Sequence, residues 1–507
     1  MGGKRWVMKR RDFIKVTAKG GVLAVASSAM LDLILRGEAF PQELLYSSSP
    51  GLEASLAKVI EAALSSGGQY ADVYLEEVSR TGISLADGIV RSVEYGVDKG
   101  GGVRVVSNWK TGYAFCDSWD EPDLARVARV AAEISRGGGR VEAANLTERQ
   151  GRGLVKYKIS PDDVGASKKA EVVSLIDRVA RGYDPAIKQV RVSYRDEIRK
   201  IVIATSDGGF VRQEIPLVWI EVDTLAERGS KRHPGYVRQS KKMGFEYAEP
   251  GFIEETAREA ARQAVDMLDA GDSPSGEMPV VIGSGGGVVF HEAVGHGLEA
   301  DSVERKTSFY AGLVGTKVAS DLITLVDDGS IPNMRGSFDF DDEATPAGRA
   351  VLIEGGILKG YMYDLMSARK MGAVPTGNGR RQSYMDYPLA RMTNTFITAG
   401  TASAEEIIAQ TGRGIFAKRL GGGEVDTVTG NFTFGVREAY LIEKGKITSP
   451  VRGATLVGNG PEILKRIDMV GNDLSFWPGT CGKGQWVPIT SGAPTLRISS
   501  IVVGGRG

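Results

Sequence analysis

The sequence predicts an α+β protein, in which an N-terminal region that mixes helices with strands precedes a β-rich C-terminal region. Apolar residues recur at helical spacing over residues 52–64 and 252–270, which predicts two amphipathic helices. Apolar and polar residues alternate over short runs such as 71–75, 440–443 and 495–503, which is typical of strands. A chain of 507 residues is long enough for at least two domains, each with its own core.

Residues 1–45 are interpreted as a targeting segment and linker. Two arginines in the run Lys9–Lys15 precede a charge-free stretch from Gly20 to Leu31, which is the layout of a twin-arginine export signal. This stretch is shorter than the ~20 residues that span a bilayer as a helix, so membrane contact is expected only through an uncleaved signal, if at all. The sequence therefore favours export, and a basic extension of a cytoplasmic protein is the alternative.

Residues 46–272 are predicted to form a first, α/β domain. Gly67-Gly68 ends the helix predicted over 52–64, Asp87-Gly88 predicts a hairpin turn, and the glycine-rich stretch 271–276 is the expected domain boundary. Further helices are expected over 121–135 and 168–181, and strands over 103–106, 190–193, 201–205 and 218–225.

Residues 273–507 are predicted to form a β-rich domain with an antiparallel sheet or a barrel-like core. A strand over 279–282 is followed by a glycine-rich turn and a helix from Val288 onward. This layout resembles a dinucleotide-binding fingerprint, but Val288 stands where the third glycine should be and no Gly-Lys-Ser/Thr follows, which argues against nucleotide binding. A capping box at Ser403–Glu406 predicts one interior helix.

The predicted helix carries the string His291-Glu292-Ala293-Val294-Gly295-His296, which uses two of the three histidines in the chain. Imidazole nitrogens are good zinc ligands, and Glu292 can serve as the base that activates a zinc-bound water. Residues i and i+5 lie about 140° apart on a regular α-helix, so Gly295 and Gly297 are expected to mark a π-bulge or a kink. The alternative is a surface helix with two unrelated histidines.

Cys481 is the preferred third zinc ligand. It lies in the stretch 477–484, which we expect to be a loop whose glycines let the thiolate approach a metal. The other cysteine, Cys116, follows an apolar run and is expected to pack as a small hydrophobic residue. A buried loop thiol or a single disulfide are the alternatives for Cys481, and the disulfide would remove the proposed ligand.

Several further motifs follow in an order that resembles the TldD/PmbA family, and specifically its metal-bearing TldD branch. The resemblance covers roughly residues 45–507 and is most specific from Pro279 onward. The motifs are Gly297–Asp301, Asp341–Pro346, Thr376–Arg381, Arg391–Thr395, Gly421–Asp426, Glu438–Glu443 and Gly453–Glu462.

This resemblance implies a zinc metallopeptidase that acts on unfolded or short peptides, with an N-terminal α/β domain and a β-rich C-terminal domain. It implies His291, His296 and Cys481 as the zinc ligands and Glu292 as the catalytic glutamate. It also implies a homodimer, or a heterodimer with a PmbA-like subunit that lacks these metal residues. The stretch 487–494 departs from the family's pattern, because it is less glycine-rich than the family's usual end.

The charge balance argues against a nucleic-acid partner, because 63 basic residues equal 63 acidic ones. A peptide substrate is expected to add as a strand to an open sheet edge, with 393–395 and 421–423 as candidate groove residues against ordinary turn chemistry. Glu299 and Asp301 are candidates for orienting a ligand imidazole, against a solvated helix end.

Two other functional classes stay open. One is a thiol hydrolase with Cys481 as nucleophile and a histidine as base. The other is a non-catalytic peptide-binding subunit of a TldD/PmbA-type complex.

Overall fold

The computed structural model describes residues 14–17, 51–137, 139, 141–426 and 428–505. It divides the chain into two compact units. Unit 1 contains the chain up to Val265 together with Gln382–Tyr387, and unit 2 contains Asp266–Arg381 and Pro388–Gly507. The pattern Lys9–Arg11 and the stretch from Gly20 to Leu31 lie outside the described residues, so the predicted export signal stays a prediction. Among the helices that are described, none combines the length and apolarity needed to cross a bilayer.

Unit 1 is built on an eight-stranded sheet in the order β1-β3-β2-β6-β7-β5, with β4 paired to β3 and β8 paired to β7. Neighbouring strands are antiparallel except for the short β5–β7 pair. The strands are β1 (Ile14–Thr17), β2 (Tyr70–Ala86), β3 (Ile89–Ser107), β4 (Lys110–Cys116), β5 (Thr147–Glu148), β6 (Ile187–Thr205), β7 (Gly209–Arg228) and β8 (Lys231–Lys241).

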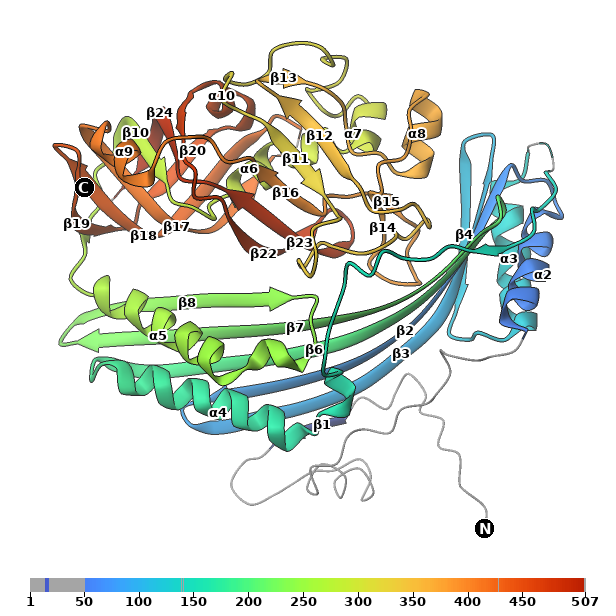
Figure 1. The fold of residues 1–507 in the computed structure, drawn as a ribbon, viewed down its shortest axis with the longest axis horizontal. Helices are drawn as coiled ribbons and strands as arrows, with labels where there is room; N and C mark the ends of the chain where they lie inside the picture. Colours follow the sequence, from blue (N-terminus) through green and yellow to red (C-terminus); the bar gives the residue numbers. More distant parts are fainter. Residues whose placement is uncertain (1–13, 18–50, 138, 140, 427, 506–507) are drawn as a thin grey trace. The chain divides into compact units, whose positions relative to one another are not determined.

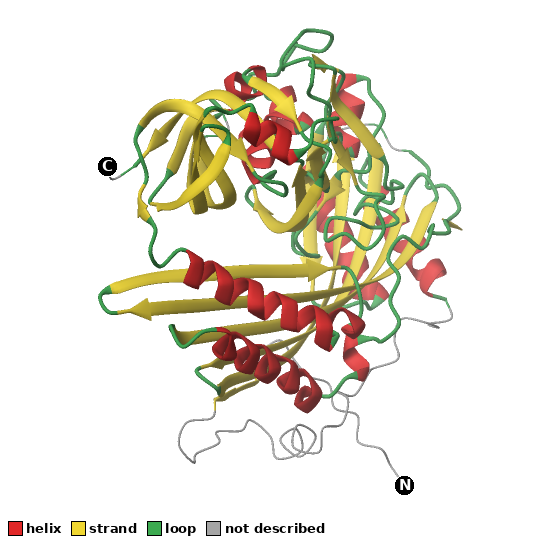
Figure 2. Cartoon of the chain, turned by 60° about the vertical axis from the view of Figure 1, so that its left-hand side comes forward, coloured by secondary structure: helices red, strands yellow, loops and turns green. Residues whose placement is uncertain are grey.

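Among the described residues, four α-helices accompany this sheet: α2 (Leu52–Leu64), α3 (Glu121–Ser135), α4 (Ala166–Tyr183) and α5 (Pro250–Asp266). In both views α4 and α5 run side by side along the long strands (Figure 1 and Figure 2). The predicted helices over 52–64 and 121–135 have the bounds of α2 and α3. The predicted hairpin turn is also present, because Asp87 and Gly88 both have positive φ between β2 and β3.

Four strands of unit 1 are much longer than predicted. The runs expected over 71–75 and 103–106 are parts of β2 and β3. The short strands expected over 190–193 and 201–205 are parts of the single strand β6, and the strand expected over 218–225 is the middle of β7. Charged residues separate the apolar runs of β6, but the structure pairs them rather than ending the strand there. Glu197 forms an ion pair with Arg80, and Asp196 forms one with the buried Lys169.

The segment Gln382–Tyr387 belongs to unit 1 although it comes from the C-terminal half of the sequence. The backbone N–H of the buried Tyr384 donates to Glu76, and its carbonyl accepts from the Tyr113 hydroxyl at 2.6 Å. Gly100 leaves room for this segment, because a Cβ at that position would overlap the Tyr384 ring.

Unit 2 contains a closed ring of five strands in the order β17-β10-β24-β20-β18, since β18 also pairs with β17. The predicted β-rich domain with a barrel-like core is therefore confirmed. A second sheet has the order β13-β12-β11-β16-β23-β22, and β14 pairs with β15. The strands are β9 (Gly271–Asp272), β10 (Gly276–Ile282), β11 (Leu325–Asp328), β12 (Arg349–Glu354), β13 (Ile357–Leu358), β14 (Gly379–Arg380), β15 (Leu389–Ala390), β16 (Asn394–Ile397), β17 (Arg413–Val425), β18 (Asn431–Glu443), β19 (Lys446–Arg452), β20 (Thr455–Asn459), β21 (Ile467–Val470), β22 (Ser475–Gly482), β23 (Trp486–Ala493) and β24 (Leu496–Gly504).

Short helices fill the connections of unit 2. The predicted capping box is present at the start of α9, where Ser403 and Glu406 each bond the other's backbone. The helices are α6 (Val288–Ala293), the 3₁₀-helix η3 (Gly295–Leu298), α7 (Ala300–Glu304), α8 (Leu365–Met371), α9 (Ala404–Ala409) and α10 (Gly460–Lys465).

Candidate metal centre

The helix that carries the histidines begins directly after a barrel strand. β10 ends at Ile282, a glycine-rich turn follows, and α6 starts at Val288. The turn passes close to β23, because a Cβ at Gly287 would overlap the backbone of Gly492. These contacts explain the glycines that resemble a dinucleotide fingerprint: they permit close packing of strand, turn and helix.

The helix breaks between the two histidines. α6 ends at Ala293, Val294 leaves the helical region with φ −123°, and η3 continues from Gly295. The expected kink is present, but a π-bulge is wrong, because the following turn is tightened to 3₁₀ geometry rather than widened. A Cβ at Gly295 would overlap the Met392 sulfur, so any larger residue there would force the Met392 side chain to move.

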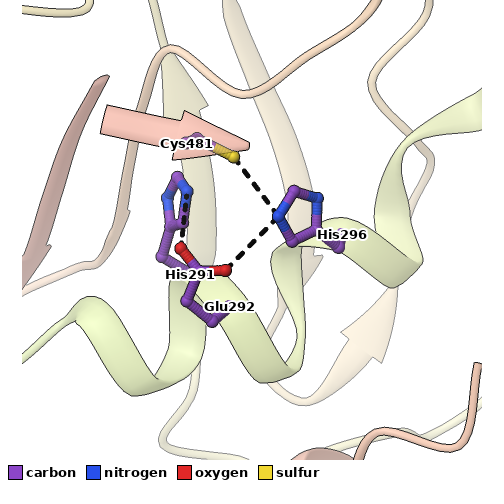
Figure 3. Close-up of side chains that lie close together, drawn as sticks. All are labelled: His291, Glu292, His296 and Cys481. Carbon is purple, nitrogen blue, oxygen red and sulfur yellow. Dashed lines mark hydrogen bonds and ion pairs between the residues drawn. The ribbon is translucent and has the colours of Figure 1, made fainter. Parts of the chain in front are cut away.

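This break brings His291 and His296 to the same site in spite of their five-residue spacing. Their ring centroids are 6.0 Å apart and their planes are inclined by 74°. Both rings are buried, whereas the side chain of Glu292 is 30% exposed. Figure 3 shows that Glu292 lies between the rings, with oxygens 3.8 Å from Nε2 of His291 and 3.4 Å from Nε2 of His296.

Cys481 completes the cluster from a distant part of the sequence. Its Sγ lies 3.2 Å from Nε2 of His296, and one donor atom from each of the four residues falls within 4.8 Å of the others (Figure 3). Two zinc ligands with bonds of ~2.3 Å to sulfur and ~2.0 Å to nitrogen lie ~3.5 Å apart in a tetrahedron. The sulfur and the His296 nitrogen are therefore close to the spacing of zinc ligands.

The expectation that Cys481 lies in a loop is wrong. It belongs to strand β22 and is paired with Val487 of β23. The glycines that suggested a loop serve the hairpin, since Gly484 takes φ +71° in the turn between the two strands. Cys116 ends β4 in unit 1 and is partly buried, and both cysteines are free thiols.

The four side chains shift one another's pKa values. Burial raises the pKa of the Cys481 thiol, but the adjacent His296 charge opposes burial, and the resulting pKa is about 6. Burial lowers the pKa of His296, but Glu299 and the Cys481 thiolate raise it well above its usual value. The pKa of Glu292 is lowered, because the two histidines outweigh its burial.

The cluster fits a metal ion. Among the residues that the structure describes, neither ring nitrogen of the buried His291 has a hydrogen-bond partner. A buried polar atom without a partner is costly, and a metal bond is one way to satisfy it. Two imidazoles and a thiolate are a donor set that zinc prefers, and Glu292 is a carboxylate beside them.

The candidates for orienting the ligands differ in their contacts. Glu299 lies with Oε2 at 2.9 Å from Nδ1 of His296, whereas Asp301 forms ion pairs with Lys483 and Arg305. Sequence reasoning missed Lys483 and Arg391, which both lie near Glu299. The only sequence feature that could have pointed to Lys483 is its position two residues after the predicted ligand Cys481.

The candidate groove residues 393–395 have a structural role instead. Thr393 and Thr395 are buried, and both hydroxyls donate to the carboxylate of Asp327 at 2.7 Å. They therefore do not line an open groove. The other candidate, 421–423, lies in β17 and stays a prediction.

Three family models match the chain. They describe the PmbA/TldA metallopeptidase domain 1 at residues 71–135, the central domain at 159–268 and the C-terminal domain at 275–505. A protein of Haemophilus influenzae named Metalloprotease TldD homolog is 42% identical over 86% of this chain and 93% of its own length. A Zinc metalloprotease TldD homolog of Saccharolobus solfataricus is 26% identical over 88% of this chain and 99% of its own length.

Solved structures share the fold. The crystal structure of TldE from Thermococcus kodakarensis superposes with a TM-score of 0.72 at 21% identity, covering 89% of this chain and all of that one.

Proposed function

The chain belongs to the PmbA/TldD metallopeptidase family, and on that premise we propose that it is a zinc-dependent peptide hydrolase. His291, His296 and Cys481 hold the metal in this proposal, and Glu292 is the catalytic base. The observation that carries it is the buried His291 ring without a hydrogen-bond partner, which faces a cluster of zinc-type donors.

Zinc, when bound, would polarise the scissile carbonyl and make a coordinated water more acidic. In this proposal Glu292 moves the proton. Its lowered pKa keeps the carboxylate ionised at neutral pH, so one oxygen accepts a proton from the attacking water and later delivers it to the leaving amine nitrogen. Its partial exposure lets a substrate reach the same carboxylate.

We propose short or unfolded peptides as substrates, in keeping with the family. An extended peptide would bind through main-chain hydrogen bonds with loose sequence preference. The edge strand β22 offers few free backbone groups to a peptide, because the carbonyls of Gly479 and Cys481 already accept hydrogen bonds from Arg335 and Arg391. We therefore expect the substrate backbone to pair elsewhere near the centre.

We also propose a partner subunit and export. A homodimer or a heterodimer with a PmbA-like subunit follows from the family resemblance, and light scattering of the purified protein with and without such a subunit tests it. Export by the N-terminal signal, with a cytoplasmic location as the alternative, is tested by fractionation after replacement of Arg10 and Arg11 by lysine.

One observation favours a second candidate. Cys481 and His296 form a close thiolate–imidazole pair, which is the arrangement of a thiol hydrolase. In that case Cys481 attacks the carbonyl itself and no metal is needed.

Metal analysis, combined with mass spectrometry of digested peptide pools, distinguishes these possibilities. The metallopeptidase proposal expects about one zinc per chain, loss of hydrolysis on chelation and recovery when zinc is returned. Cys481→Ser should lower zinc content, and Cys116→Ser is the matched control that should not. Hydrolysis that resists chelation but not thiol alkylation would support the thiol hydrolase, and zinc binding without hydrolysis would support a non-catalytic subunit.

A further inference from the structure

A buried carboxylate connects the two elements that bring donors to the centre. Glu299 follows η3 and is fully buried. Its Oε2 lies 2.9 Å from Nδ1 of His296 and 2.8 Å from Nζ of Lys483, and its Oε1 lies 3.6 Å from Nε of Arg391. One carboxylate thus contacts a histidine of the helical segment and two cations.

Both cations hold the hairpin that carries Cys481. Arg391 donates to the carbonyl of Cys481 at 2.9 Å and to the carbonyl of Gln485 at 2.8 Å, on the two sides of the hairpin turn. Lys483 lies in the turn itself and also donates to the carbonyl of Ala390 at 2.9 Å. Cys481 is therefore fixed through its backbone by the same charges that compensate Glu299.

The carboxylates of this network are compensated by cations. Lys483 lies between Glu299 and Asp301 at 2.8 Å from each, Arg391 lies beside Glu299, and Arg305 pairs with Asp301. Buried charges with several hydrogen-bonding partners form a rigid arrangement, whereas removing one partner leaves an uncompensated charge.

We propose that Glu299 is a positioning residue that sets His296 and Cys481 as one pair for metal binding. Because it accepts from Nδ1–H, it fixes the tautomer in which Nε2 faces the cluster. Through Lys483 and Arg391 it holds the hairpin so that the Cys481 sulfur lies beside that nitrogen. His291 has no such partner, so the network acts on two of the three donors.

This inference rests on the proposed zinc function, and cobalt substitution tests it. The wild-type protein loaded with Co²⁺ should show a near-ultraviolet thiolate-to-cobalt band. Glu299→Gln keeps the side-chain volume but removes the charge, and we expect a weaker band and zinc affinity lowered by about 10- to 100-fold. Glu304→Gln is the matched control, because Glu304 pairs with Lys370 on the surface of α7 and touches none of the donors.

A double variant separates positioning from simple charge compensation. Glu299→Gln combined with Lys483→Met removes one charge of each sign, so the fold should persist, as circular dichroism would check, while zinc affinity stays low. Restored zinc affinity in the double variant would mean that Glu299 only neutralises Lys483, which overturns the proposal.

The outcomes for the two proposals are distinct. A normal wild-type cobalt spectrum with unchanged zinc affinity in Glu299→Gln overturns the role of Glu299 alone. A wild-type protein that binds no cobalt through sulfur overturns the proposed function, and the positioning role with it.

Discussion

Replacing each histidine by leucine should change the stability of the metal-free protein by different amounts, although both changes abolish tight zinc binding. His296→Leu removes the hydrogen bond to the buried Glu299, and hydrogen bonds to charged groups contribute about 1.5–3 kcal/mol to stability. His291→Leu removes no hydrogen bond of normal length among the described residues, but it does end the longer contact of Nε2 with Glu292 at 3.8 Å and the interaction with the Cys481 thiol. Removing the buried ring nitrogens removes a desolvation penalty of about 1–3 kcal/mol, whereas fitting leucine into the same space carries an overpacking cost of about 1–3 kcal/mol.

The free energies of unfolding of the two variants should therefore differ by about 2 kcal/mol, and His296→Leu should be the less stable variant. For a unit of this size, about 2–4 °C of melting temperature corresponds to 1 kcal/mol, so the gap should be about 4–8 °C. Differential scanning calorimetry of protein freed of metal by a chelator measures it. Zinc at a thousandfold excess over its dissociation constant should then stabilise the wild-type protein by about 4 kcal/mol and neither variant.

A metal-free His291→Leu protein that melts as low as His296→Leu would refute this reasoning. It would show that the His291 ring makes a stabilising contact in the metal-free protein, and the main argument for a metal at this site would be lost.

Three further predictions concern catalysis, pH and the fold. Glu292→Gln should keep its zinc, but its rate of hydrolysis should fall by about 10²- to 10⁴-fold. Glu304→Gln, the control, should keep both zinc and activity. Full activity in Glu292→Gln would mean that Glu292 is not the catalytic base. Zinc binding should strengthen as pH rises: contacts within the cluster raise the pKa values of His291 and His296, so zinc must displace ring protons over a wider pH range than with free imidazoles, and below the Cys481 pKa of about 6 it must also displace the thiol proton. Calorimetry in buffers of different ionisation enthalpy counts these protons, and affinity independent of pH would contradict the shifts. Ser403→Ala should cost about 1 kcal/mol of unfolding free energy by removing the capping box of α9, which chemical denaturation would detect.

Local signals predicted the helices of this chain well. α2 and α3 have the predicted bounds, because glycines end the first and a proline opens the second. Strand lengths were harder to predict. The charged middle of β6 suggested an interruption, and only the tertiary ion pairs of Asp196 and Glu197 explain why the strand continues.

The candidate centre was only partly accessible from sequence. The histidine motif named one side of it, but nothing in the local sequence places Cys481, 185 residues later, against His296. The glycines around Cys481 suggested a loop, whereas they serve a hairpin. The network of Glu299, Lys483 and Arg391 joins three separate segments, so it emerges only with the tertiary fold. The roles of these residues in metal binding and catalysis stay predictions.

The membership of Gln382–Tyr387 in unit 1 limits how the protein can be dissected. An expression fragment that stops at Val265 would lack Tyr384. The space beside Gly100 that the Tyr384 ring fills would then be empty, and the Glu76 carboxylate would lose the backbone N–H of Tyr384 as one of its donors. Such a truncation is expected to aggregate or to be degraded, even though its sheet and helices are all present. Independent production of unit 1 would require the missing hexapeptide to be grafted on or supplied in trans.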